Sequence, residues 1–163
     1  MSDLSIKELA LAAVLSYAGF HPYGHISEGN KQGVQGRVDY KDMVERYNRE
    51  QWNKLSDEEK AKIHAAGFDG QQMFANALYG KGMEKEAKIV NALYKLGYIS
   101  GIKPKDTKGD PELLAESSKT SKGRINALLA ASGAYDLMGG KDSSLDFRVL
   151  DGNAPGLVYT KRF

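Results

Sequence analysis

The segment 110–129 constrains the fold of this chain more than any other stretch. Its residues predict two short helices that are joined by a tight polar turn over Ser117–Ser121. Asp110 is a favourable cap for the first of these helices, and Pro111 suits the first helical position. A further helix is expected just before this segment, over 84–96, because apolar residues recur there at helical spacing.

The chain ends in a predicted β-hairpin. Apolar and polar residues alternate over 145–150, and a returning strand is expected over 157–162. Asp151-Gly152-Asn153 between them is typical of a turn. Thr120 or Ser121 is expected to cap the helix that precedes the hairpin. The element order over the second half is therefore helix, helix-turn-helix and hairpin.

The first half of the chain predicts further helices and one long loop. Ser5 and Ser56 each stand three residues before a glutamate, which is typical of a capping box at the start of a helix. Asp39 is expected to cap another helix, and Gly67 to end one. The expected helices cover 5–17, 40–52, 56–66 and 69–78. The segment 20–38 is expected to be a glycine-rich loop, because it holds four glycines and a proline without a helical period.

The order of elements over 84–163 resembles a winged helix-turn-helix domain. The predicted fold class is mainly α, a helical bundle with a C-terminal winged-helix-like section that ends in a β-hairpin. We divide the chain into a helical section, 1–82, and the winged-helix-like section, 83–163, or alternatively treat both as one continuous domain.

The resemblance implies binding to double-stranded DNA in a regulatory or assembly role. In such domains the second helix of the motif enters the major groove and the hairpin touches the backbone. The residues that would then contact DNA are Thr120, Ser121, Lys122, Arg124, Asn126, Arg148, Lys161 and Arg162. Small residues at Gly123, Ala127 and Ala130 favour instead a helix packed on both sides. The alternative is therefore a protein–protein interaction or virion-assembly module without DNA contact, and either reading allows a homodimer.

Charge and composition exclude several classes of protein. Residues 1–80 carry nine Lys or Arg against eleven Asp or Glu, whereas residues 81–163 carry fourteen against ten, so the basic excess lies in the second half. A net charge of +2 is small for a dedicated nucleic-acid coat. The absence of cysteine excludes disulfides and thiolate metal sites. No signal peptide or membrane span is predicted, so we expect a cytoplasmic protein without a membrane partner.

The spacing of two histidines suggests a metal site, but the residues between them argue against it. His21 and His25 are four residues apart, and Glu28 follows three residues later. Ligands at this spacing converge when a helix presents them, but Pro22 and Gly24 make a helix improbable here. We therefore predict two loop histidines, no metal and no cofactor.

Glu28 also suggests a second class of function. Ser27-Glu28-Gly29 and the glycines that follow are similar to lysozyme-type glycosidases, which place a catalytic glutamate between a first helix and a glycine-rich hairpin. The resemblance implies Glu28 and Asp39 as the carboxylate pair across the scissile bond. A small hydrolase is thus the enzymatic alternative to a binding protein.

Overall fold

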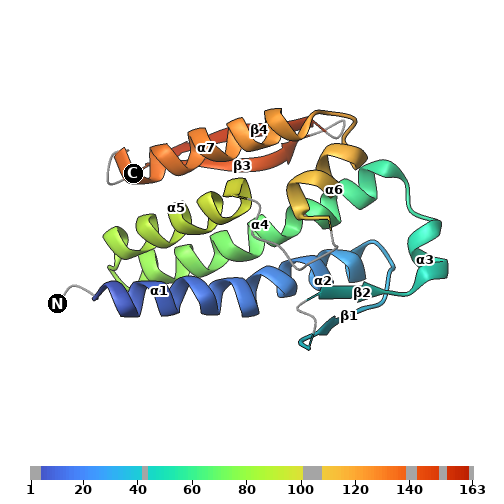
Figure 1. Ribbon diagram of the computed structural model, residues 1–163, viewed down its shortest axis with the longest axis horizontal. Coiled ribbons are helices and arrows are strands. Elements are labelled where there is room, and N and C mark those ends of the chain that lie inside the picture. Colours follow the sequence, from blue (N-terminus) through green and yellow to red (C-terminus); the bar gives the residue numbers. More distant parts are fainter. Residues whose placement is uncertain (1–4, 42–43, 101–107, 139–142, 151–153, 162–163) are drawn as a thin grey trace.

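The computed structural model describes residues 5–41, 44–100, 108–138, 143–150 and 154–161. The predicted fold class is confirmed: the protein is mainly helical and has a two-stranded antiparallel hairpin at its C-terminal end (Figure 1). No helix in the described part of the chain is long and apolar enough to cross a bilayer.

Three helical segments follow one another without a break at the N-terminal end. They are α1 (Ile6–Leu15), the π-helical turn η1 (Ser16–Phe20) and α2 (His21–Lys31). The capping box of Ser5 is confirmed, since its Oγ accepts from the backbone N–H of Glu8 and the Glu8 carboxylate accepts from the Ser5 N–H. The predicted loop over 20–38 is wrong for residues 20–31. Pro22 comes directly after the π-helical turn η1, in which the His21 N–H bonds to the Ser16 carbonyl, and this turn accommodates the proline and its missing N–H within a continuous helix.

A small antiparallel hairpin follows α2. Its strands are β1 (Gly36–Asp39) and β2 (Val44–Tyr47), and the short helix α3 (Arg49–Asn53) comes next. The predicted helix over 40–52 is therefore wrong. Asp39 caps no helix; its carboxylate accepts from Arg46 Nε at 2.8 Å and from the Lys41 backbone N–H at 3.2 Å, and both bonds stabilise the hairpin.

The long helix α4 (Asp57–Gly80) is the central element of the molecule. Its capping box at Ser56 is confirmed, but Gly67 does not end it and no second helix starts near Asp69. The helix continues because its glycines allow close packing: a Cβ atom at Gly70 would overlap the carbonyl oxygen of Phe20 in η1. The energy of that packing outweighs the roughly 1 kcal/mol that a glycine costs in a helix.

The second half of the chain follows the predicted order. It consists of α5 (Glu84–Ser100), α6 (Asp110–Ser117), α7 (Lys122–Met138), β3 (Ser143–Leu150) and β4 (Ala154–Lys161). The hairpin pairs Leu145 with Tyr159 and Phe147 with Leu157. Between α6 and α7, Lys119 adopts a positive φ of 52°, and Ser121 Oγ accepts from the Arg124 N–H at 3.1 Å. Ser121 is therefore the cap of α7.

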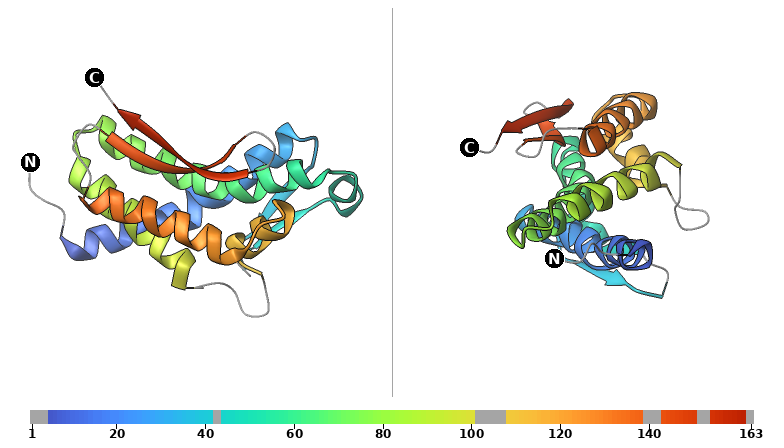
Figure 2. Two further views of the ribbon diagram at one scale, coloured as in Figure 1. Left: turned by 90° about the horizontal axis from the view of Figure 1, so that it is seen from above. Right: turned by 90° about the vertical axis from the view of Figure 1, so that its left-hand side faces the viewer.

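The helices form layers around α4, which packs against α2, α5, α6 and β3. Figures 1 and 2 show α1 and α2 on one side of α4 and α5, and α7 with the β3–β4 hairpin on the other. The buried core draws on both halves of the chain, so the two predicted sections share it. Its members are Ala61, Ala65, Phe68, Tyr94, Tyr98, Leu114, Ala115, Ile125, Leu129 and Phe147.

Candidate metal centre

Two histidines and an aspartate meet where α2, α4, α5 and α6 come together. His21 Nε2 lies 3.1 Å from Asp110 Oδ2, and His25 Nε2 lies 3.5 Å from Asp110 Oδ1. The two Nε2 atoms are 3.1 Å apart. Only 5% of the His21 surface and 2% of the His25 surface are exposed, whereas 13% of the Asp110 side chain is. These three residues could hold a metal ion, because one ligand atom from each lies within 4.8 Å of the others.

Local structure places the two imidazoles side by side. Residues four apart in an α-helix share a face, and α2 begins at His21, so both rings project from its first turns. The rings meet edge to face with centroids 4.5 Å apart. Gly67 on α4 leaves room for them, since a Cβ atom there would overlap both rings. The π-helical turn η1 comes directly before this pair, and such turns often accompany functional sites.

Hydrogen bonds to the outer nitrogens orient both rings. His25 Nδ1 lies 2.6 Å from the carbonyl oxygen of Ile63, and because a carbonyl only accepts, Nδ1 carries the proton. The lone pair of a neutral His25 therefore sits on Nε2 and faces Asp110. The hydroxyl of Tyr98 hydrogen-bonds to His21 Nδ1. Metal-binding histidines usually have such partners on the nitrogen that does not bind the ion.

The Asp110 carboxylate and the facing Nε2 atoms of His21 and His25 are all hydrogen-bond acceptors when both imidazoles carry their proton on Nδ1. A positive charge among them stabilises this arrangement. Burial disfavours an imidazolium, but the Asp110 carboxylate more than compensates and raises the pKa of His25 to about 9. Burial likewise disfavours the Asp110 carboxylate, yet His25 and His21 hold its pKa below the ordinary range. A proton on His25 or a metal cation can supply this charge, and the two compete for the same lone pair.

Two further titratable groups surround the centre in uncharged form. Burial lowers the pKa of His64 to about 4, against the opposing effect of Asp110. Burial also raises the pKa of Tyr47, and the negative charges of Glu45 and Asp110 act in the same direction. The neighbourhood of the three ligands is therefore shielded from water, which strengthens their electrostatic interaction with a cation.

The sequence identified two of these three residues but predicted them to lie in a loop, whereas they lie in the helix α2. The inference that Pro22 and Gly24 prevent a helix is incorrect, and this was the reason for rejecting a metal. Glu28 does not complete the group: its carboxylate accepts from Gln32 Nε2 at 2.7 Å and Lys31 Nζ at 3.1 Å. Asp110 takes that place. It was expected only as a helix cap, but the cap position of α6 belongs to Gly109 and Asp110 is the first residue of the helix, so the predicted cap is wrong by one residue.

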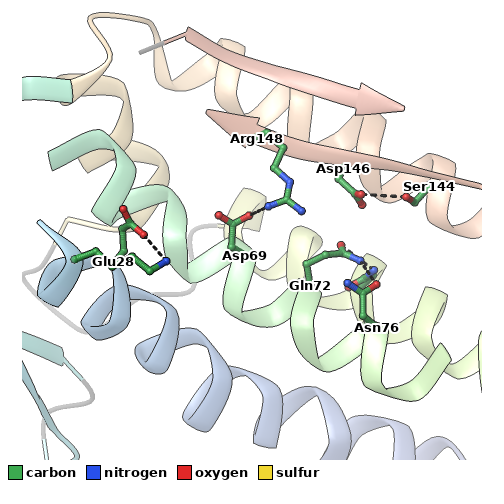
Figure 3. A network of polar contacts seen from close by, with 9 residues as sticks. Glu28, Asp69, Gln72, Asn76, Ser144, Asp146 and Arg148 are labelled. Carbon is green, nitrogen blue, oxygen red and sulfur yellow. Dashed lines mark hydrogen bonds and ion pairs between the residues drawn. The ribbon is translucent and has the colours of Figure 1, made fainter. Parts of the chain in front are cut away.

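The residues predicted to face DNA have varied environments. Lys122 Nζ donates to Glu112 at 2.7 Å, and Arg148 forms an ion pair with Asp69 on α4 (Figure 3). Ser121, Arg124 and Lys161 are exposed, and Thr120 is half-buried. The Asn126 Oδ1 atom is buried. Arg162 lies outside the described residues.

The residues predicted for a glycosidase lie on different elements. Glu28 is in the last turns of α2 and Asp39 ends β1. Figure 3 shows Glu28 on α2, apart from the Asp69–Arg148 ion pair between α4 and β3. Although burial acts to raise the pKa of Glu28, hydrogen bonds from Gln32 and Lys31 lower it overall. A general acid for glycoside hydrolysis needs a raised pKa. The lowered pKa of Glu28 does not fit this role.

Comparisons with protein-family models, with curated proteins and with solved structures gave no match.

Proposed function

We propose that this protein binds one divalent transition-metal ion, with zinc as the best representative, through His21 Nε2, His25 Nε2 and one oxygen of Asp110. The observation that carries the proposal is the convergence of these groups: the two Nε2 atoms are 3.1 Å apart, and each lies 3.1–3.5 Å from a different oxygen of Asp110. Ligand atoms of a tetrahedral zinc ion lie about 3.3 Å apart, given bonds of roughly 2.0–2.2 Å. Small movements of the side chains would therefore accommodate the ion.

The donor set selects the class of metal. Two imidazoles and one carboxylate suit zinc and its neighbours in the first transition series, whereas magnesium and calcium prefer oxygen ligands alone. Three protein ligands leave a fourth position for water. Because both imidazoles are buried in the helix packing, the site favours a structural or regulatory ion. The ion would join α2 to α6.

A zinc titration of the metal-free protein tests this proposal. We expect one ion per chain by isothermal titration calorimetry and, with Co²⁺ in place of Zn²⁺, a visible spectrum of a four-coordinate site. His25→Gln should weaken zinc binding by more than about 100-fold, since it removes a ligand and not merely a supporting group. His64→Gln is the matched control, because His64 is also a buried imidazole near the site, and it should change the affinity less than threefold.

Two results would overturn the metal proposal. One is a wild-type protein that takes up no zinc at micromolar concentration. The other is a His25→Gln variant that binds zinc as tightly as the His64→Gln control, which would place the ion elsewhere. Circular dichroism spectra of both variants establish that they are folded before either result is interpreted.

A second candidate function is DNA binding through α6 and α7. What supports it is the element order, in which α7 begins at a capped turn and the β3–β4 hairpin follows it. Against it, Lys122 and Arg148 are engaged by carboxylates, and the exposed positions around Arg124 include Gly123 and Ala127. The last observation equally supports the protein–protein interaction alternative, with α7 as the contact.

Fluorescence anisotropy with mixed-sequence duplex DNA at about 50 mM and 200 mM salt tests the DNA candidate. A DNA reader should bind more weakly at the higher salt and lose affinity when Lys122 and Arg124 are both replaced by alanine. Equal signals from the variant and the wild type would exclude α7 as the DNA contact. The glycosidase alternative stays a prediction, and loss of cell-wall hydrolysis in Glu28→Gln would be its test.

A further inference from the structure

We infer that the metal ion controls the docking of α6, and through α6 the first turn of α7. This inference rests on the proposed function. Its starting point is the distribution of the ligands: His21 and His25 belong to α2, whereas Asp110 is the first residue of α6. A bound ion therefore crosslinks two elements that are far apart in the chain.

The two crosslinked helices are not packed along each other. Both lie against α4, with α2 on its glycine-rich face and α6 contributing Leu114 and Ala115 to the buried core. The Asp110 carboxylate reaches from α6 to the histidines of α2. Binding an ion at this point would add a link at the N-terminal end of α6, beside the packing of this helix on α4.

A second contact passes the position of α6 on to α7. Glu112 lies one half-turn after Asp110, and its carboxylate accepts from the Gly109 backbone N–H at 2.9 Å and from Lys122 Nζ at 2.7 Å. Lys122 is the first residue of α7. Asp110 and Glu112 both belong to the first turn of α6, so the ion pair of Glu112 with Lys122 connects the helix that carries the metal ligand to the start of the helix that carries Arg124.

Hydrogen exchange measured by mass spectrometry, with and without zinc, tests the inference on the full chain. A ligand that binds only the docked form lowers the population of the undocked form by a factor of 1 + [Zn]/Kd, so at 100 Kd we expect amides in Asp110–Ser117 to exchange up to about 100-fold more slowly. Amides of β3 and β4 that exchange by local opening should change little. These β3 and β4 amides are the internal control, because a general gain in stability would slow their exchange as well as that of α6.

Variants make the test specific. Asp110→Asn should abolish the zinc effect on α6, whereas Glu116→Gln, on the exposed side of the same helix, should retain it. Lys122→Met should keep the zinc-dependent protection of α6 and lose that of residues 122–126.

The outcomes distinguish the inference from the proposed function. If calorimetry shows one zinc ion at the three ligands but α6 is slowed no more than β3 and β4, the docking inference is wrong and the metal proposal stands. If the wild type binds no zinc, the proposed function itself fails. If α6 is protected equally in Asp110→Asn, the crosslink does not act through this carboxylate.

Discussion

Gly67 on α4 lies directly against the imidazole of His25 on α2, so closely that a Cβ atom at residue 67 would overlap Nε2 of that ring. The same Cβ atom would overlap the ring of His21. The imidazoles that we propose as metal ligands therefore owe their position to a missing side chain on a neighbouring helix. This relationship makes Gly67 a positioning residue for the centre.

The first prediction concerns Gly67→Ala. Because the added methyl group displaces one or both imidazoles, we expect zinc affinity to fall by about 10–100-fold, as for other changes that disturb the orientation of ligands. The overpacked interface should also cost about 1–3 kcal/mol in the free energy of unfolding. A competition titration with a chromogenic chelator measures the first effect and urea denaturation the second. An unchanged zinc affinity would show that the rings do not depend on this glycine.

Much of the fold was accessible from the sequence because its signals are local. The capping boxes at Ser5 and Ser56, the Asp-Pro start of α6 and the alternation in β3 all act within a few residues, and each predicted the correct element. The prediction failed at Gly67, which was expected to end a helix that continues past it. There the deciding factor is packing against other helices, which the local sequence does not contain.

Only part of the candidate site could be predicted, because the sequence shows local spacing but not tertiary packing. His21 and His25 are close in sequence and their spacing was recognised, but the helix that presents them was rejected because of Pro22 and Gly24. Gly24 is in fact a contact with α4, not a helix breaker. Asp110 could not be added, because only the tertiary packing of α6 brings it to the histidines.

The second prediction uses the pair of possible caps at the start of α7. The structure assigns the cap to Ser121, whose Oγ accepts from the Arg124 N–H. Ser121→Ala should therefore destabilise the protein by about 1 kcal/mol, within the range of roughly 0.5–2 kcal/mol for lost caps. Thr120→Ala should cost less than about 0.5 kcal/mol. Urea denaturation of both variants decides between them, and the reverse order of stabilities would assign the cap to Thr120.

The third prediction contrasts two helical glycines. A Cβ atom at Gly24 would overlap the backbone carbonyl oxygen of Ala66, which cannot move without separating α2 from α4. Gly24→Ala should thus cost at least about 1–3 kcal/mol. Gly97 in α5 has open space around its Cα, so Gly97→Ala should stabilise the protein by roughly 0.5–1 kcal/mol. Thermal denaturation should shift in opposite directions for the two variants. A melting temperature that rises for Gly24→Ala as well would show that the α2–α4 contact is looser than described.

The last prediction concerns the ion pair of Lys95 and Asp136, which joins α5 to α7 with both side chains almost fully buried. Burial raises the pKa of Asp136, although the ammonium of Lys95 acts in the opposite direction. Removing one partner leaves a buried charge without compensation, so Lys95→Met or Asp136→Leu should each cost about 3–5 kcal/mol. The Lys95→Met/Asp136→Leu double variant should cost about 2–3 kcal/mol less than the two single changes added together, because it leaves no unpaired buried charge.

A double-mutant cycle by urea denaturation measures the coupling between these two residues. We expect a coupling energy of about 2–3 kcal/mol for the pair, near the upper end for residues in contact. Glu50 and Lys54 on α3 provide the control, since both are largely exposed and their ion pair should contribute less than about 1 kcal/mol. A coupling for Lys95 and Asp136 no larger than this control would mean that water reaches the pair. The α5–α7 interface would then be more open than its buried charges indicate.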